Sequence, residues 1–96
     1  MAIAELKMVS QCEVESMMNR HLLGEFGNVA NNGDGQFIVK SEVDGDEFVG
    51  QTVRKLNEFQ GGMVSHGECH LDGSKMFSFT GFRDSIPVWT VLVIFQ

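Results

Sequence analysis

The stretch from Ser65 to His70, written SHGECH, concentrates side chains that often bind metals or transfer protons. Two imidazoles, one carboxylate and one thiol occupy six consecutive residues. Imidazole, carboxylate and thiolate groups are the usual protein ligands of zinc, and His and Glu are common general acids and bases. What these groups can do together depends on the element that carries them.

Residues 63 to 70 form a predicted strand, because they open a series of short apolar runs separated by turn residues. Side chains alternate on a strand, so His66, Glu68 and His70 share one face, while Cys69 is expected to point to the other, towards the core. The two imidazoles then lie about 13 Å apart and cannot both reach one ion. A metal or acid–base site needs further ligands, for which Asp84 or His21 is available. The alternative is a solvated strand face.

Other short motifs do not support known chemistry. Residues 44 to 46 begin like a calcium loop, but Phe48 and Val49 stand where an oxygen ligand and an invariant glycine are required. The glycines around Asp34 lack the preceding strand and the third glycine of a dinucleotide site. Cys12 falls in the first turn of a predicted helix, where a thiol usually packs. We predict no cofactor, no metal and no catalytic residue, and the question of enzyme activity stays open.

Length and composition predict one α+β domain over residues 1 to 96. A chain of 96 residues with 43% hydrophobic residues closes one core. Two cysteines are too few for a disulfide framework, and Glu5 and Lys7 interrupt the apolar segment that a signal peptide needs. The longest apolar run, from Ile86 to Phe95, is half of a membrane span. We therefore expect a cytoplasmic protein without a membrane segment.

The charge of the chain argues against binding to nucleic acid. Seven Lys and Arg stand against thirteen Asp and Glu, for a net charge of -6, and the cations are scattered, whereas a phosphate backbone needs them clustered. An acidic surface suits a basic protein partner or simple solubility. The candidate partner-binding residues are the acids between the two predicted helices and at the start of the second: Asp34, Glu42, Asp44, Asp46 and Glu47.

Two helices are predicted from capping signals and spacing. Ser10 and Glu13 have the form of a capping box, so a helix is expected over residues 10 to 23, with Gly24 after its end. Asp46 is the expected cap of a second helix at 47 to 60, before a pair of glycines. Residues 3 to 9 alternate weakly and fit either a strand or an additional helical turn.

The remaining segments predict an antiparallel sheet of about four strands with the two helices packed on one face. Residues 24 to 35 are rich in Gly and Asn and are expected to form a loop, and residues 36 to 43 form the first strand. Short connections join the last three strands into a meander. The final strand, residues 86 to 95, is apolar on both faces. It is therefore central and covered on both sides, or its outer face meets a second subunit, and we favour a homodimer.

A resemblance adds genomic context. The run from Arg20 to Asn28, RHLLGEFGN, followed by Gly61-Gly62 and by DGSKMF at residues 72 to 77, resembles small uncharacterised proteins of bacterial plasmids and other mobile elements. Those proteins carry Arg-His-x-x-Gly-Asp-Trp-Gly before a Gly-Gly and a terminal strand pair. Residues 81 to 84 depart from their Glu-Ala-Asp-Arg, and residues 34 to 47 form an additional acidic segment. The resemblance implies no activity.

Two functions follow as hypotheses. The first is a non-enzymatic protein-interaction module of mobile-element type, which binds an unknown protein partner through its acidic surface or its apolar C-terminal strand. The alternative is a small-ligand or metal-binding domain that uses the polar group on the third strand together with the turn after the fourth. The candidate ligand-binding residues are His66, Glu68, His70, Arg83 and Asp84.

Overall fold

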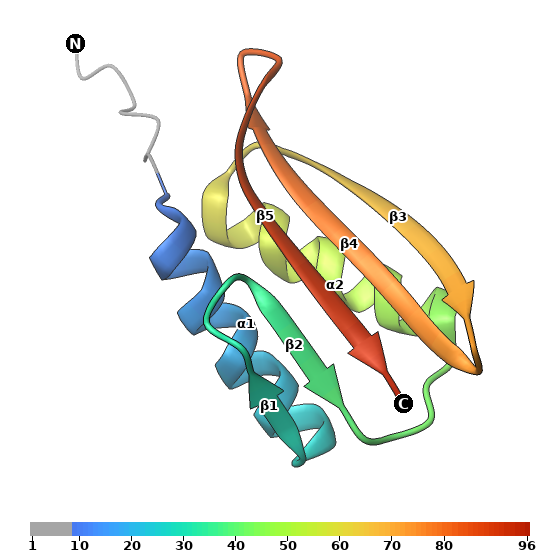
Figure 1. Cartoon of the computed structure of the whole chain (residues 1–96). Helices are drawn as coiled ribbons and strands as arrows, with labels where there is room; N and C mark the ends of the chain where they lie inside the picture. Colours follow the sequence, from blue (N-terminus) through green and yellow to red (C-terminus); the bar gives the residue numbers. More distant parts are fainter. Residues whose placement is uncertain (1–8) are drawn as a thin grey trace, which may run out of the picture.

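Two helices and five strands make up the part of the chain that the computed structural model describes, residues 9 to 96 (Figure 1). In chain order the elements are α1 (Gln11–Phe26), β1 (Val29–Asn31), β2 (Gln36–Val39), α2 (Gly45–Gln60), β3 (Met63–Leu71), β4 (Ser74–Arg83) and β5 (Ile86–Phe95). The α+β class is confirmed. The open question over residues 3 to 9 falls outside the described residues, apart from Val9, which is buried.

Helix α1 begins where the capping signal predicts and ends later than predicted. Ser10 is the N-cap, and its Oγ accepts a hydrogen bond from the backbone N–H of Glu13 at 3.2 Å. The helix continues through Gly24 to Phe26 and stops at Gly27, whose φ is 80°. The predicted end at residue 23 is wrong because the extra turn brings the Phe26 ring into the core. That packing outweighs the roughly 1 kcal/mol that a glycine costs inside a helix.

Helix α2 also carries a cap at each end, one of them at a different residue from the prediction. Asp44, and not Asp46, is the N-cap: its Oδ1 accepts from the backbone N–H of Glu47 at 3.1 Å. Asp46 lies inside the first turn, where a negative charge suits the helix dipole. The helix ends at Gly61 in the left-handed conformation, with φ 69°, as the glycine pair predicts.

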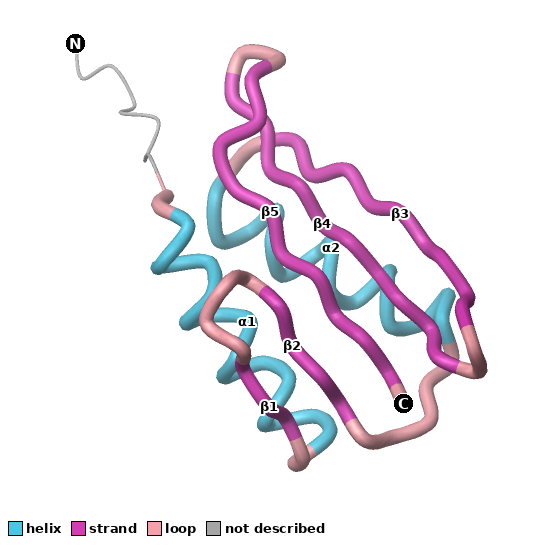
Figure 2. Tube along the Cα trace, viewed as in Figure 1, coloured by secondary structure: helices cyan, strands magenta, loops and turns pink. Residues whose placement is uncertain are grey.

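The sheet has five strands in the order β1-β2-β5-β4-β3, against the four predicted (Figure 2). The additional strand β1 lies within the predicted loop 24 to 35 and pairs with β2 in an antiparallel hairpin. Strand β2 ends at Val39, and residues 40 to 43 belong to the connection to α2. Strand β4 pairs antiparallel with both β3 and β5, whereas β5 pairs parallel with β2 on its other side. The C-terminal strand β5 is thus the middle strand.

The core lies on the face of the sheet that the helices cover. Both helices pass behind the sheet in the view of Figure 1. The strand register places the buried side chains on that face, and α1 and α2 add their own buried residues to the same core. From the strands these residues are Phe37, Val39, Phe77, Phe79, Trp89, Val91, Val93 and Phe95. Phe48 of α2 packs its ring against Phe95 with centroids 4.8 Å apart.

Cys69 does not face this core, contrary to the prediction. It pairs with Met76 of β4, whereas Glu68 pairs with the buried Phe77. Paired residues of antiparallel strands share a face, so Glu68 faces the helices and Cys69 faces away from them. The thiol is exposed. Sequence alternation gave the correct grouping of side chains but the wrong side, because both faces of this edge strand are largely exposed.

A buried polar link holds the end of α2 to the β4–β5 hairpin. The Trp89 indole Nε1 donates to Gln60 Oε1 at 2.6 Å, and Gln60 Nε2 donates to the Met63 carbonyl at 3.0 Å. The indole covers Gly81, its cross-strand partner, so closely that a Cβ at this position would overlap the ring. The absence of a side chain at Gly81 is therefore required by the position of the only tryptophan.

A second polar link fixes the start of β2 beside β5. The Gln11 side chain donates to the Thr90 carbonyl at 2.7 Å and accepts from the Thr90 N–H at 3.0 Å, as a neighbouring strand would. Glu15 accepts from the N–H of Gly35, and the Gly35 carbonyl accepts from the N–H of Leu92 at 2.7 Å.

Neither α1 nor α2 is long and apolar enough to cross a membrane.

Candidate functional site

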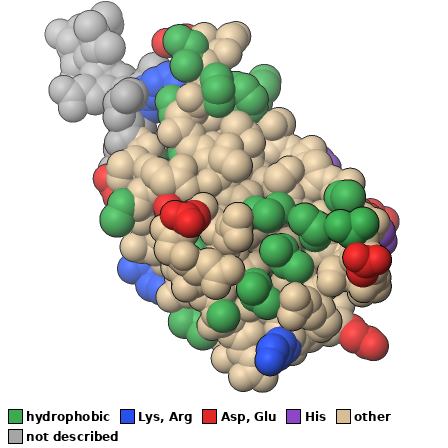
Figure 3. All heavy atoms as spheres, in the orientation of Figure 1, with side chains coloured by type: hydrophobic (Ala, Val, Ile, Leu, Met, Phe, Trp, Pro, Cys, Tyr) green, Lys and Arg blue, Asp and Glu red, His purple; other side chains and the backbone are tan. Residues whose placement is uncertain are grey.

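The face of the sheet turned away from the helices carries an apolar row that crosses all five strands. Ala30 pairs with Ile38, Ile38 with Ile94, Ile94 with Met76, and Met76 with Cys69. The three central side chains are half-buried against one another, and the two outer residues are exposed. We call this surface the open face. Figure 3 views it directly, and hydrophobic side chains gather over β3, β4 and β5.

The open face carries no charged side chain within the strands. The five strands contain three charged residues: Glu68, Lys75 and Arg83. Glu68 and Lys75 pair with the core residues Phe77 and Phe95 and so belong to the helix side. Arg83 ends β4, beyond a register shift at Gly81. In a chain with 21% charged residues, this lack of charge distinguishes the open face from the rest of the surface.

A shallow hollow interrupts the open face near β3. Its volume is about 220 Å³, and Gly67, Cys69, Met76, Ser78 and Leu92 contribute to its lining. The hollow exists because Gly67 has no side chain: a Cβ there would stand 3.0 Å from Ser78 Oγ. The open face is therefore an apolar surface with one depression, and the hydroxyl group of Ser78 lies in the lining of that depression. Such a surface suits contact with another protein.

The polar group on β3 lies on the opposite side, near the start of α2. His66, Glu68 and His70 all share the helix side of the strand, and all three are exposed. His70 Nε2 contacts Glu68 Oε2 at 2.5 Å, while Glu68 Oε1 approaches Gly45 in the first turn of α2. Among residues 9 to 96, no three His, Cys, Asp or Glu side chains come together in a way that could hold a metal ion.

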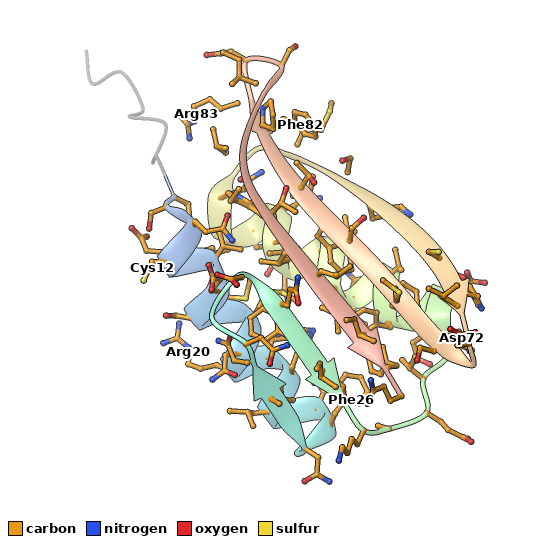
Figure 4. The ribbon with its side chains drawn as sticks, in the orientation of Figure 1. Cys12, Arg20, Phe26, Asp72, Phe82 and Arg83 are labelled. Carbon is orange, nitrogen blue, oxygen red and sulfur yellow. The ribbon has the colours of Figure 1, made fainter. Side chains whose placement is uncertain are left out.

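The other two candidate ligand residues lie at the far end of the sheet. Arg83 ends β4, and Asp84 begins the turn to β5 with φ 51°. Figure 4 shows Phe82 and Arg83 near this tip and Asp72 at the opposite end. Glu68 pairs with Phe77, six residues before Arg83 on β4, a separation of about 20 Å. The structure therefore does not bring the five candidate ligand residues into one site.

A cavity of about 640 Å³ lies beside this tip. It is lined by the end of α2, the start of β3 and the β4–β5 turn, with Met63, Phe82, Arg83 and Asp84 among its residues. Its volume falls in the range of roughly 300 to 1,000 Å³ that is usual for small-ligand sites. Sequence reasoning identified Arg83 and Asp84 but missed the apolar Met63 and Phe82, because the cavity depends on how the hairpin projects beyond the helix.

The five acidic residues that the sequence suggested for partner binding do not form one surface either. Glu42, Asp44 and Glu47 line a hollow of about 180 Å³ at the junction of the two helices, where Glu25 joins them. Asp46 points elsewhere on the first turn of α2 and does not line it. Asp34 belongs to the turn between β1 and β2, at the other end of β2. One oxygen of Asp44 is already used as the helix cap.

One histidine that the sequence placed among possible ligands is buried between the helices. His21 Nε2 lies 3.4 Å from Thr52 Oγ1 of α2, and its buried Nδ1 has no hydrogen-bond partner among residues 9 to 96. Burial lowers the pKa of His21 below its usual 6.5, and the positive charge of Lys55 lowers the pKa further, while Glu25 acts in the opposite direction. Burial therefore favours the neutral form of the ring, which belongs to the helix packing and lies in neither hollow.

No protein-family model, no curated protein and no solved structure matches the chain.

Proposed function

We propose that this chain is a non-enzymatic protein-interaction module whose contact surface is the open face. The observation that carries the proposal is the combination of the apolar row from Ala30 to Cys69 with the lack of charge on this face, in a chain of net charge -6. Burying a charge at an interface core is costly, so uncharged apolar patches favour protein contact. The apolar C-terminal strand takes part through Leu92 and Ile94 at the centre of the sheet.

The partner that fits this surface is a protein with an apolar contact region bordered by Lys or Arg. The apolar row supplies the contact, and the acidic remainder of the molecule attracts a basic border and steers its approach. Strand lengths and spacing give the open face an area of about 500 to 600 Å², below the roughly 800 Å² per partner of a standard interface. We therefore propose a transient, micromolar interaction. Its origin in a mobile element is a separate proposal, which rests on the resemblance of residues 20 to 28 and 72 to 77.

The proposal is tested by NMR titration with a synthetic amphipathic peptide that presents Leu on one helical face and Lys beside it. The largest changes in amide chemical shift are expected at the open-face residues of β2, β4 and β5. The affinity of the peptide should decrease as the salt concentration rises. Leu92→Lys places a charge in the centre and should weaken binding at least tenfold, equivalent to about 1.4 kcal/mol. Thr90→Lys, at an exposed neighbouring position, serves if the first variant folds poorly.

Leu23 provides the matched control. It is an exposed leucine on α1, away from the open face, so Leu23→Lys adds the same charge without touching the proposed contact. Binding that both leucine variants weaken equally would reflect net charge alone and would refute the role of the open face. Shift changes confined to the acidic junction of the helices would instead assign the partner to Glu25, Glu42 and Glu47.

A second function is favoured by the cavity at the tip. Its apolar lining by Met63 and Phe82 beside the Arg83–Asp84 turn suits a small molecule with an aromatic ring. The probe is 1-anilinonaphthalene-8-sulfonate, an aromatic anion, followed by NMR of the same residues. Saturable binding there, with the open face unaffected, would support a ligand-binding domain. Binding weaker than about 1 mM would argue against it, since drug-sized ligands normally gain more from such a volume.

A further inference from the structure

Strand β3 ends the sheet with one long free edge. All nine of its residues pair with β4 without interruption, and β3 is the terminal strand in the sheet order. Within residues 9 to 96, Figures 1 and 2 show no other segment beyond it. Such an edge presents a row of backbone N–H and C=O groups about 30 Å long, which is a template for another strand.

The other edges of the molecule are protected, and this one is not. Strand β1 at the opposite end has three residues. The part of β5 that extends beyond β2 contains Pro87, which offers no N–H, and the Gln11 side chain occupies the backbone of Thr90. Strand β3 has no proline, no lysine or arginine and no bulge in its pairing with β4. Natural proteins use those devices, and also inward-pointing charges, to prevent edge pairing. The one charged side chain of β3 is Glu68, on the helix side, so this edge is available to a strand that sets a side chain without negative charge opposite Glu68.

The sequence of β3 is complementary to itself about its middle residue. We propose that a second copy of this chain adds its β3 antiparallel to this edge, with the two-fold axis at Gly67. This register sets His66 opposite Glu68 of the second copy, and Glu68 opposite its His66. The same register sets Met63 opposite Leu71 at both ends and Ser65 opposite Cys69.

These pairs account for features that the single chain leaves unexplained. Met63 and Leu71 are 73% and 59% exposed, and the pairing brings them together on the open-face side of the sheet. Directly opposite side chains in an antiparallel pair have Cβ atoms about 4.5 to 5.5 Å apart, which is within reach for an imidazole and a carboxylate. A chain of net charge -6 is repelled by its own copy at most surfaces, whereas here each acid meets a histidine. Gly67 leaves the axis free of side chains.

The assembly would join two five-stranded sheets into one of ten strands. It would also place two open faces side by side, which doubles the area available to a partner. The inference does not depend on the proposed partner binding, because it uses the backbone edge of β3 and not the open face.

The test is sedimentation equilibrium of the full chain and of charge variants at positions 66 and 68. The parent should be a dimer with a dissociation constant below about 100 μM, the range of a modest interface. His66→Glu sets two acids opposite each other twice in the dimer and should raise the dissociation constant at least about tenfold. Glu68→Lys should also weaken the dimer. The double variant His66→Glu/Glu68→Lys restores opposite charges and should return to within about threefold of the parent.

Rescue by the double variant is specific to this register, since only pairing about Gly67 places the two positions opposite each other. Circular dichroism checks that each variant is folded, which is expected because both side chains are exposed. Met63→Lys/Leu71→Lys offers a second disruption at exposed positions. A parent that is monomeric at 500 μM, about five times the upper limit set above, would overturn the inference. A dimer that resists all edge variants but dissociates with Leu92→Lys would also overturn it, since the copies would then meet through their open faces.

Discussion

Replacing Gly81 by alanine should be among the most destabilising single changes in this chain. A Cβ built at Gly81 lies 2.5 Å from Cζ2 of Trp89 and closer still to Nε1 and Cε2 of the same ring. The indole is 3% exposed and has little room to move. Overfilling a packed core costs about 1 to 3 kcal/mol, and displacing the ring also breaks its hydrogen bond to Gln60, leaving a buried donor at a further cost of about 1 to 3 kcal/mol.

The expected loss of about 2 to 6 kcal/mol is a large fraction of the stability of such a domain, which is typically about 5 to 15 kcal/mol. Urea denaturation at 25 °C measures it directly, with fluorescence of the single tryptophan as the signal. In a Trp89→Phe background the chain has no tryptophan, so unfolding is followed there, and in the parent for comparison, by far-UV circular dichroism. The smaller ring relieves the overlap, so the cost of Gly81→Ala should fall by at least about 1 kcal/mol, the size of coupling usual for residues in contact.

Gly50 is the matched control for the same chemical change. It lies inside α2, and no atom of residues 9 to 96 beyond its own helical turn and its chain neighbours stands within 4 Å of its Cβ position. Gly50→Ala should therefore stabilise the protein by about 0.5 to 1 kcal/mol. If Gly81→Ala cost less than about 1 kcal/mol and left the Trp89 fluorescence unchanged, the reasoning about the ring contact would be refuted, because ordinary surface substitutions have effects of up to about 0.5 kcal/mol.

Three further predictions concern single residues. Ser10→Ala should lower the free energy of unfolding by about 1 kcal/mol through loss of the helix cap, measured by urea denaturation. Because the folded pKa of His21 is lowered, folding stability should be fully present above the unfolded pKa near 6.5 and should decline as the pH falls below it. The decline should be smaller in His21→Leu, and an equal decline in both proteins would contradict it. The expectation that the Cys12 thiol packs is wrong, because Cys12 is exposed, as is Cys69. Both should therefore react with a thiol reagent without denaturant, and protection of either one would contradict its placement.

Local signals in the sequence predict the start of α1 and the end of α2, and packing determines the helix end that these signals miss. Ser10 and the pair after Gln60 mark helix ends correctly, because caps act within a few residues. Gly24 is misleading, since the gain from burying Phe26 lies in contacts with residues 22 and 69 positions later in the chain, Phe48 and Phe95. No local pattern reports such a contact.

In the sheet, too, local patterns predict some features, whereas others depend on which strands pair. Alternation on β3 correctly groups His66 with Glu68, but the side on which they lie follows from the pairing of Glu68 with Phe77. The parallel pairing of β2 with β5 is not predicted from the sequence, because no short turn connects these two strands. The open face follows from this pairing, because Ile38 joins Ile94 only when β2 lies beside β5. The apolar C-terminal strand was recognised from the sequence, whereas the row that it completes was not.

The central place of β5 has a consequence for how the chain folds during synthesis. A ribosome makes β1 and β2 first and β3 and β4 later, yet these two pairs touch β5 on opposite sides and not each other. At about 5 to 20 residues per second, roughly 3 to 11 s separate Val39 from Phe95, its partner across the parallel pair. During that interval α1 can pack against the short strands β1 and β2 but not against β5, and the edge of β2 that pairs with β5 stays open. Folding of the sheet is therefore expected to be a late, nearly all-or-none event, and the growing chain is most prone to aggregation just before it.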